Sequence, residues 1–321
     1  MQVAKINTNS MNDPVFLNRH SDMGSISKTR LNSFESDIFI KNTPKNQIPF
    51  TGHVSFENFI IGFLKNKSYN TSIKGSKRPY LSICKNLQDI ITPVDIKVSK
   101  TESIQAWDIN PKNSKKYVII LHGFSQNITS NQPLYNVLKN TDFGILAIDY
   151  RGYGKNPVSK HITENDIVQD VNASVKYLNS KGINYIGLVG HSFGSYIAAK
   201  ISNIRNFNFQ ILVSPMISLE FWLKNVLKHP NKYKNEIRMI KYIPNFKNQY
   251  SKIFNITKHL EHNSTPTHVV QAKKDTYIRT SKINSLVKLI PNLKTYTIIQ
   301  DGGHRMDNNK INQISDILEN L

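Results

Sequence analysis

Residues 185–200 read YIGLVGHSFGSYIAAK, and this stretch decides the fold. Its first part, Tyr185 to Val189, has the composition of a buried strand, and its last part, Ser195 to Lys200, resembles a helix. Between them stands Gly190-His191-Ser192-Phe193-Gly194. The pattern Gly-x-Ser-x-Gly can occur by chance in a chain of this length. A strand before it and a helix after it make it a strong indication of a functional serine turn.

The two glycines around Ser192 indicate a sharp turn from strand into helix. A side chain at either glycine would collide with the strand or the helix, and the turn holds the serine in a strained conformation that exposes its hydroxyl. The helix beginning at Phe193 directs its amides and positive dipole end to the place where negative charge would form. We therefore interpret Ser192 as a nucleophile for acyl transfer.

A serine nucleophile needs a general base within hydrogen-bonding reach. His304 follows a predicted strand at 294–300 and the turn Asp301-Gly302-Gly303, whose glycines allow the backbone to bring an imidazole over the site. The other histidines lack a comparable setting. The sequence therefore predicts that His304 takes the proton of Ser192.

The base in turn needs an acid that fixes its tautomer and stabilises its charged form. Asp275 follows the predicted strand at 267–272, at the carboxyl end of the sheet, where open α/β folds bind ligands. We predict that Asp275 orients His304. Asp301 and Glu220 are the alternative acids.

Acyl transfer also needs two amide donors for the oxyanion that forms. One is expected to be the amide of Phe193, and the other the amide of Phe124, which follows the predicted strand at 117–121. His122 precedes Gly123 in this loop, and we interpret it as a residue that braces the loop by hydrogen bonding rather than as a base.

The rest of the chain predicts strands that alternate with helices. A hairpin is expected from 94–98 and 104–109, and a helix that opens at Thr163-Glu164 and ends near Gly182 has apolar residues at helical spacing. Such an order predicts an α/β fold with a mainly parallel central sheet flanked by helices. Further strands are predicted at 117–121, 143–148, 185–189, 209–213, 267–272 and 294–300, and a closing helix at 311–321.

The chain divides into three predicted regions. Residues 1–50 are rich in Asn, Ser, Lys and Asp without periodicity, which predicts a disordered or loosely packed extension. Residues 51–93 are expected to form a short helical segment that packs on the body, with helices near 55–64 and 80–91. Residues 94–321 form the predicted main domain, with a helical, lysine-rich lid inserted at about 217–262.

The chain has 321 residues and a formal charge of +20, from 42 Lys and Arg against 22 Asp and Glu. The lysines are scattered among asparagines, so we expect no specific nucleic-acid binding. Lysines of the predicted lid suggest a weak association with an anionic membrane surface, or a merely solvated surface. The single cysteine, Cys84, and the lack of a signal peptide or membrane span predict a cytoplasmic protein, while non-classical export through the N-terminal tail stays open.

Over residues 94–321 the sequence resembles the α/β-hydrolase superfamily, particularly its monoacylglycerol lipase-like, lysophospholipase-like and serine aminopeptidase-like branch. The resemblance rests on the Ser192 turn, on the residues proposed above as its partners, and on Asp149-Tyr150-Arg151-Gly152-Tyr153-Gly154. It implies an α/β-hydrolase fold and structural rather than catalytic roles for Asp149 and Arg151. Two departures, a Thr101-Glu102-Ser103 turn and lysines before Asp275, remove none of the predicted catalytic groups.

These patterns predict a serine hydrolase that cleaves a small-molecule acyl ester, or a thioester, through an acyl-enzyme. The chemistry requires no cofactor and no metal, and serine at the turn disfavours mechanisms that use a carboxylate nucleophile. In the lid, Phe221, Trp222 and Leu223 either line an acyl pocket or pack within the lid. Two alternatives stay open: a serine peptidase of the same fold, and a non-catalytic binding protein that uses the basic surface.

Overall fold

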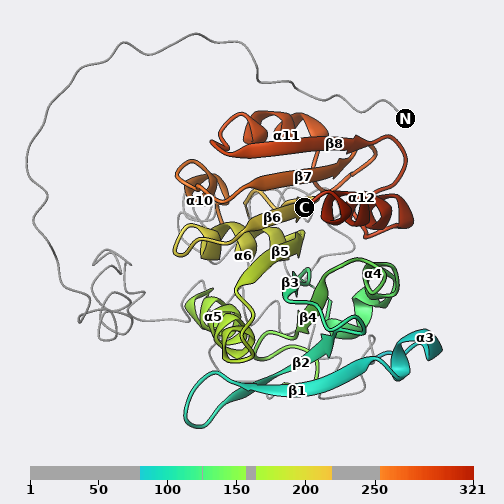
Figure 1. Cartoon of the computed structure of the whole chain (residues 1–321). Helices are drawn as coiled ribbons and strands as arrows, with labels where there is room; N and C mark the ends of the chain where they lie inside the picture. Colours follow the sequence, from blue (N-terminus) through green and yellow to red (C-terminus); the bar gives the residue numbers. More distant parts are fainter. Residues whose placement is uncertain (1–79, 125, 157–163, 219–253) are drawn as a thin grey trace, which may run out of the picture. The chain divides into compact units, whose positions relative to one another are not determined.

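The computed structural model describes residues 80–124, 126–156, 164–218 and 254–321 (Figure 1). Within these ranges the chain forms one sheet of eight strands in the order β1-β2-β4-β3-β5-β6-β7-β8. The strands are Ile91–Lys97 (β1), Ser103–Ile109 (β2), Lys116–Leu121 (β3), Gly144–Ile148 (β4), Tyr185–His191 (β5), Phe209–Val213 (β6), Thr267–Ala272 (β7) and Leu293–Ile299 (β8).

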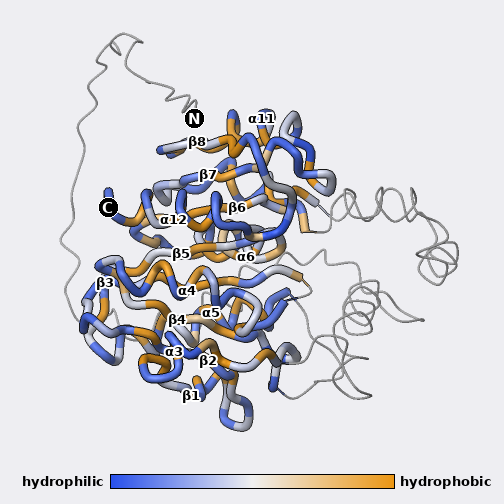
Figure 2. Tube along the Cα trace, turned by 90° about the vertical axis from the view of Figure 1, so that its right-hand side faces the viewer, coloured by the Kyte–Doolittle hydropathy of each residue, from blue (hydrophilic) through white to orange (hydrophobic). Residues whose placement is uncertain are grey.

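The sheet is mainly parallel, which confirms the predicted fold class. Strands β3 to β8 run parallel to one another, whereas β1 pairs antiparallel with β2, and β2 antiparallel with β4. Strands β4 and β6 are buried along their whole length, as expected where helices cover both faces of a parallel sheet. Hydrophobic residues recur along β5, β6 and α6 (Figure 2).

Helices cover both faces of this sheet. Helices α4 and α12 contact each other on one side, and α5 and α6 contact each other on the other side (Figure 1). Helix α5 spans nearly the range that its apolar spacing predicts. The helices are Lys85–Gln88 (α3), Gln132–Leu138 (α4), Glu164–Ser180 (α5), Phe193–Ser202 (α6), Thr257–Leu260 (α10), Thr280–Val287 (α11) and Asn308–Glu319 (α12), with a 3-10 turn at Ile128–Asn131.

The segment before β1 differs from the helix predicted at 80–91. Only Lys85–Gln88 is helical, because tertiary hydrogen bonds hold the preceding residues extended. The amide of Leu81 donates to Thr129 Oγ1 at 3.0 Å, and the amide of Cys84 donates to Gln132 Oε1 at 2.6 Å. A side-chain acceptor from another element thus replaces the helical partner that each amide would otherwise have.

Several predictions fall on residues outside the described ranges. These are the extension at 1–50, the helix near 55–64 and most of the lid, of which only 217–218 and 254–262 are described. Phe221, Trp222, Leu223, Glu220 and the lid lysines also lie there. No helix within the described ranges combines the length and the hydropathy needed to cross a bilayer.

The topology brings distant parts of the sequence to one edge of the sheet. Because β3, β5, β7 and β8 are parallel, their carboxyl ends lie on the same side. The loops that leave these ends contain Phe124, Ser192, Asp275 and His304.

Candidate active site

Ser192 lies at the junction of β5 and α6, with φ 54° and ψ −111°. Few residues other than glycine adopt such a positive φ, so the surrounding structure must enforce it. The amide of Ser192 donates to Val213 O of β6 at 2.9 Å, and its carbonyl accepts from the amide of Met216 at 3.2 Å. The neighbouring strand thereby fixes the turn that presents the Ser192 hydroxyl.

The two glycines of this turn are sterically required. A Cβ at Gly190 would lie 2.4 Å from the carbonyl oxygen of Gly194, and a Cβ at Gly194 would lie 1.9 Å from the carbonyl oxygen of Leu121. Both obstacles are backbone atoms, which cannot rotate aside as a flexible side chain would. The close approach of α6 to the end of β3 therefore depends on glycine.

We expect Gly194→Ala to destabilise the fold by about 1–3 kcal/mol or more, because the new methyl group would overlap the backbone of β3. The movement that relieves this overlap would also displace the Ser192 hydroxyl, so any reaction that uses this hydroxyl should slow about 100-fold. Thermal unfolding followed by circular dichroism checks the first effect, and ester hydrolysis checks the second.

Gly303→Ala is the matched control for stability, since a Cβ there meets nothing within 4 Å. An unfolding temperature of Gly194→Ala equal to that of the native chain would contradict the steric argument.

The structure brings together the three residues predicted as nucleophile, base and acid. His304 Nε2 lies 2.9 Å from Ser192 Oγ, and His304 Nδ1 lies 2.9 Å from Asp275 Oδ2. An ionised carboxylate only accepts hydrogen bonds, so Nδ1 carries the proton and Nε2 is free to accept one from the serine hydroxyl. The side chain of Asp275 is fully buried, whereas that of His304 is 18% exposed.

Asp275 is held ionised by its hydrogen bonds. Burial alone would raise the pKa of its carboxyl, but the hydrogen bond and charge of His304 and two backbone amides outweigh burial, so the pKa lies below the ordinary value. These amides, of Tyr277 and Ile278, donate to Oδ1 at 2.9 and 2.8 Å. Asp275 therefore presents a fixed negative charge to the imidazole.

Two further aromatic rings contact the His304 ring, and the sequence alone did not single them out. Tyr277 has its ring centroid 5.2 Å away, and His191 has its centroid 5.4 Å away. Burial lowers the pKa of His191 to about 3, so this second imidazole stays neutral. His191 directly precedes Ser192, and this adjacency was all that the sequence offered to single it out. Its contact with the His304 loop arises only from the fold.

The residues predicted to supply oxyanion amides, Phe124 and Phe193, lie next to each other, with ring centroids 5.0 Å apart. Phe193 is the first residue of α6, and Phe124 follows β3. The loop before Phe124 is fixed through Gly123, whose amide donates to Gln126 Oε1 at 2.7 Å and whose carbonyl accepts from His122 Nδ1 at 2.8 Å. Burial lowers the pKa of His122 to about 4, which suits a neutral bracing residue.

Asp149 and Arg151, for which the resemblance implied structural roles, are both buried, and Asp149 lies near His122 of this loop. Asp149 Oδ1 accepts from the amide of Ile128 at 2.6 Å, and Arg151 Nε donates to Asp170 Oδ1 at 2.8 Å. Neither side chain has a hydrogen bond to Ser192 or His304 among those of the described residues.

The alternative acid Asp301 pairs with a lysine rather than with His304. Its carboxylate accepts from Lys274 Nζ at 2.7 Å, and both side chains are largely exposed. The other alternative, Glu220, lies outside the described ranges. Within the described ranges, Asp275 is the carboxylate that contacts His304.

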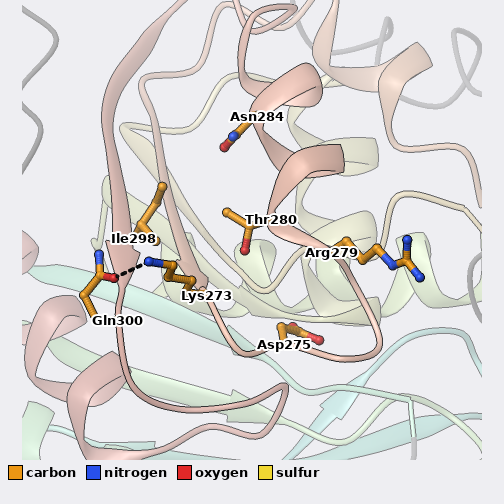
Figure 3. Close-up of a pocket in the computed structure, with 7 residues that line it drawn as sticks. All are labelled: Lys273, Asp275, Arg279, Thr280, Asn284, Ile298 and Gln300. Carbon is orange, nitrogen blue, oxygen red and sulfur yellow. Dashed lines mark hydrogen bonds between the residues drawn. The ribbon is translucent and has the colours of Figure 1, made fainter.

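A cavity of about 380 Å³ lies beside Asp275 (Figure 3). Lys273 Nζ donates to Gln300 Oε1 at 3.2 Å across one wall, while Arg279 extends away from the other lining side chains (Figure 3). Neither Ser192 nor His304 is among the residues that line this cavity. Its lining is Lys273, Asp275, Arg279, Thr280, Asn284, Ile298 and Gln300.

Metal-ligating side chains do not gather in the described parts of the chain: no group of three or more His, Cys, Asp or Glu there is placed to hold an ion. The lone Cys84 is exposed and free.

Comparison with known proteins agrees with this architecture. A solved esterase of Pyrococcus furiosus matches with a TM-score of 0.63 and 18% identity, over 76% of this chain and 95% of the esterase. This likeness shows the fold, which is that of an α/β hydrolase, and the sequence matches agree with the predicted resemblance to that superfamily. Within that superfamily, residues 112–252 match the family model described as serine aminopeptidase, S33.

Curated relatives are similar over shorter stretches. A putative esterase/lipase of Mycoplasma genitalium is 26% identical over 113 residues, which are 35% of this chain and 42% of the relative. A carboxylesterase of Bacillus subtilis is 26% identical over 190 residues, which are 54% of this chain and 77% of the relative. The chain thus spans about half the length of the first relatives it matches, at 42% and 47%.

Proposed function

We propose that the protein is a serine hydrolase that cleaves a carboxylic ester, or a thioester, of a small-molecule substrate. The observation that carries the proposal is the continuous hydrogen-bonded chain from Ser192 Oγ through His304 to Asp275, at the carboxyl ends of β5, β7 and β8. The esterase and lipase names of the similar proteins agree with an ester substrate.

In the proposed first half-reaction, Ser192 Oγ attacks the acyl carbon while its proton passes to His304 Nε2. The carbonyl oxygen becomes an oxyanion, which the amides of Phe124 and Phe193 stabilise by about 3–4 kcal/mol for each donor. His304 then gives its proton to the leaving alkoxide, and the C–O bond breaks to leave an acyl-enzyme. Asp275 stabilises the imidazolium throughout these steps.

In the second half-reaction a water molecule attacks the acyl-enzyme, and His304 takes its proton. Collapse of the second tetrahedral intermediate releases the carboxylic acid and returns the proton to Ser192 Oγ. The buried, ionised Asp275 and the neutral His191 beside the base suit this cycle, because neither competes for the proton that His304 carries.

The test is labelling of the purified native chain by a fluorophosphonate probe, followed by turnover of p-nitrophenyl esters of increasing acyl length. Labelling, together with faster hydrolysis of esters than of amino-acyl arylamides, supports the proposal. Faster turnover of the arylamides would instead favour the peptidase alternative, which the serine aminopeptidase description of the family model raises. Absence of both labelling and turnover would favour a non-catalytic binding protein.

A further inference from the structure

The loop that carries His304 has no regular backbone structure. From Gln300 to Asp307 the chain forms neither helix nor strand, between the end of β8 and the start of α12. A base must nevertheless hold its imidazole to within a fraction of an ångström of the nucleophile, because a displacement of about 1 Å costs about 100-fold in rate. Groups from outside the loop backbone must therefore fix it.

Three successive carbonyls of this loop accept hydrogen bonds from buried side chains. Gly303 O accepts from Lys310 Nζ at 2.7 Å, and Arg305 O accepts from the same nitrogen at 2.9 Å. The carbonyl of His304 itself, between them, accepts from His191 Nε2 at 2.8 Å. We call the pair Lys310 Nζ and His191 Nε2 the carbonyl clamp.

All the hydrogen-bond donors of the Lys310 ammonium are used in holding this loop. Its side chain is fully buried, and its ammonium has three N–H donors, which match three acceptors: the two carbonyls and Asp307 Oδ2 at 2.7 Å. Asp307 also begins α12, since its Oδ1 accepts from the amide of Lys310 at 3.1 Å. The charge is therefore neutralised next to the loop, and no donor is left to point to solvent.

The turn at Gly302, which precedes the clamped carbonyls, leaves room for the Asp307 carboxylate. Gly302 has φ 113°, and a Cβ there would lie 2.3 Å from Asp307 Oδ2. Glycine at this position lets the carboxylate approach closely enough to pair with Lys310. A buried ammonium is costly unless its partners are well placed, so this arrangement is unusual for a lysine in an amphipathic helix.

We propose that Lys310 is a positioning residue for His304, holding the carbonyls on both sides of it so that the imidazole keeps its geometry between Ser192 and Asp275. The proposal rests on the proposed function, in which His304 is the base. Lys310 does not contact the reacting atoms, and it acts through the backbone of the histidine loop.

The test compares Lys310→Met, which keeps most of the length of the side chain but removes its donors, with the native chain. We expect kcat for ester hydrolysis to fall about 10- to 100-fold, with KM changed less than about twofold, because the acyl-binding surface is untouched while the base is misplaced. We expect the proton NMR resonance of His304 Nδ1–H to lie far downfield in the native chain because of the bond to Asp275, and to move upfield or broaden in Lys310→Met as that bond loosens.

Lys274→Met is the matched control: this lysine pairs with Asp301 in the same loop but is 69% exposed, and its loss should alter neither readout. Should Lys310→Met fail to give a folded circular dichroism spectrum, Lys310→Gln carries the same two measurements, since its amide keeps donors for only part of the clamp.

Unchanged kcat together with an unmoved Nδ1–H resonance would overturn the proposal. The resonance also separates the two hypotheses, because it needs no turnover. A native chain without esterase activity whose resonance still moves in Lys310→Met would overturn the proposed function while supporting the clamp.

Discussion

Ser192→Ala is expected to lower kcat for a short-chain p-nitrophenyl ester by about 10⁶-fold and to abolish labelling by a fluorophosphonate. Alanine removes the oxygen that His304 Nε2 contacts at 2.9 Å, so no acyl-enzyme can form. The residual rate would come from the oxyanion amides and from substrate binding alone. Initial rates over a range of ester concentrations, with in-gel detection of the probe, check this result.

The same loss is expected for His304→Ala, and the double variant should be no slower than either single one, because residues that act as a unit are not additive. Ser285→Ala, at an exposed serine of α11, is the control and should retain native activity. Labelling that persists in Ser192→Ala would place the nucleophile elsewhere.

Asp275→Asn is expected to lower kcat by about 10⁴-fold with little change in KM. An asparagine amide can donate to His304 Nδ1, which favours the tautomer with the proton on Nε2, and that nitrogen can then no longer accept the proton of Ser192. Steady-state kinetics near neutral pH measure the effect. Asp301→Asn, which alters an exposed carboxylate of the neighbouring loop, should leave kcat unchanged.

The same variant has an expected signature in stability. The pKa of Asp275 is lower in the folded chain than in the unfolded one, so its ionisation stabilises the fold above the ordinary carboxyl pKa of about 3.9. That contribution is lost as the pH falls through the folded-state pKa. Asp275→Asn should therefore unfold at a lower temperature than the native chain at pH 7, and the difference should vanish in strong acid.

The sequence predicted the site from the order in which its residues and the strands follow one another along the chain. A serine after β5, an aspartate after β7 and a histidine after β8 each follow an apolar run, and parallel strands bring such loops to one edge. The structure places His304 within 2.9 Å hydrogen bonds of both Ser192 and Asp275, and the roles assigned to the three residues await the experiments above.

The features of the site that the sequence did not predict depend on contacts between distant elements. Lys310 occupies a position in an amphipathic helix where a lysine usually faces water, and only the fold turns it onto Gly303 and Arg305. In the sequence alone, His191 likewise has no evident role between Gly190 and Ser192. Its hydrogen bond to the carbonyl of His304 arises only when the His304 loop packs against it. The helix predicted at 80–91 was mostly wrong for the same reason, since its competing acceptors lie about 50 residues away.

The sheet order has a consequence for the chain during its synthesis. The strained serine turn is complete once β5, α6 and the neighbouring β6 have formed, with Val213 the last partner of Ser192 along the sheet. The acid and the base follow β7 and β8, so Ser192 and His304 are separated by 112 residues. A ribosome-bound chain that ends before residue 267 contains Ser192 but neither Asp275 nor His304, so the proposed acyl transfer requires the synthesis of β7, β8 and the loop that follows each of them.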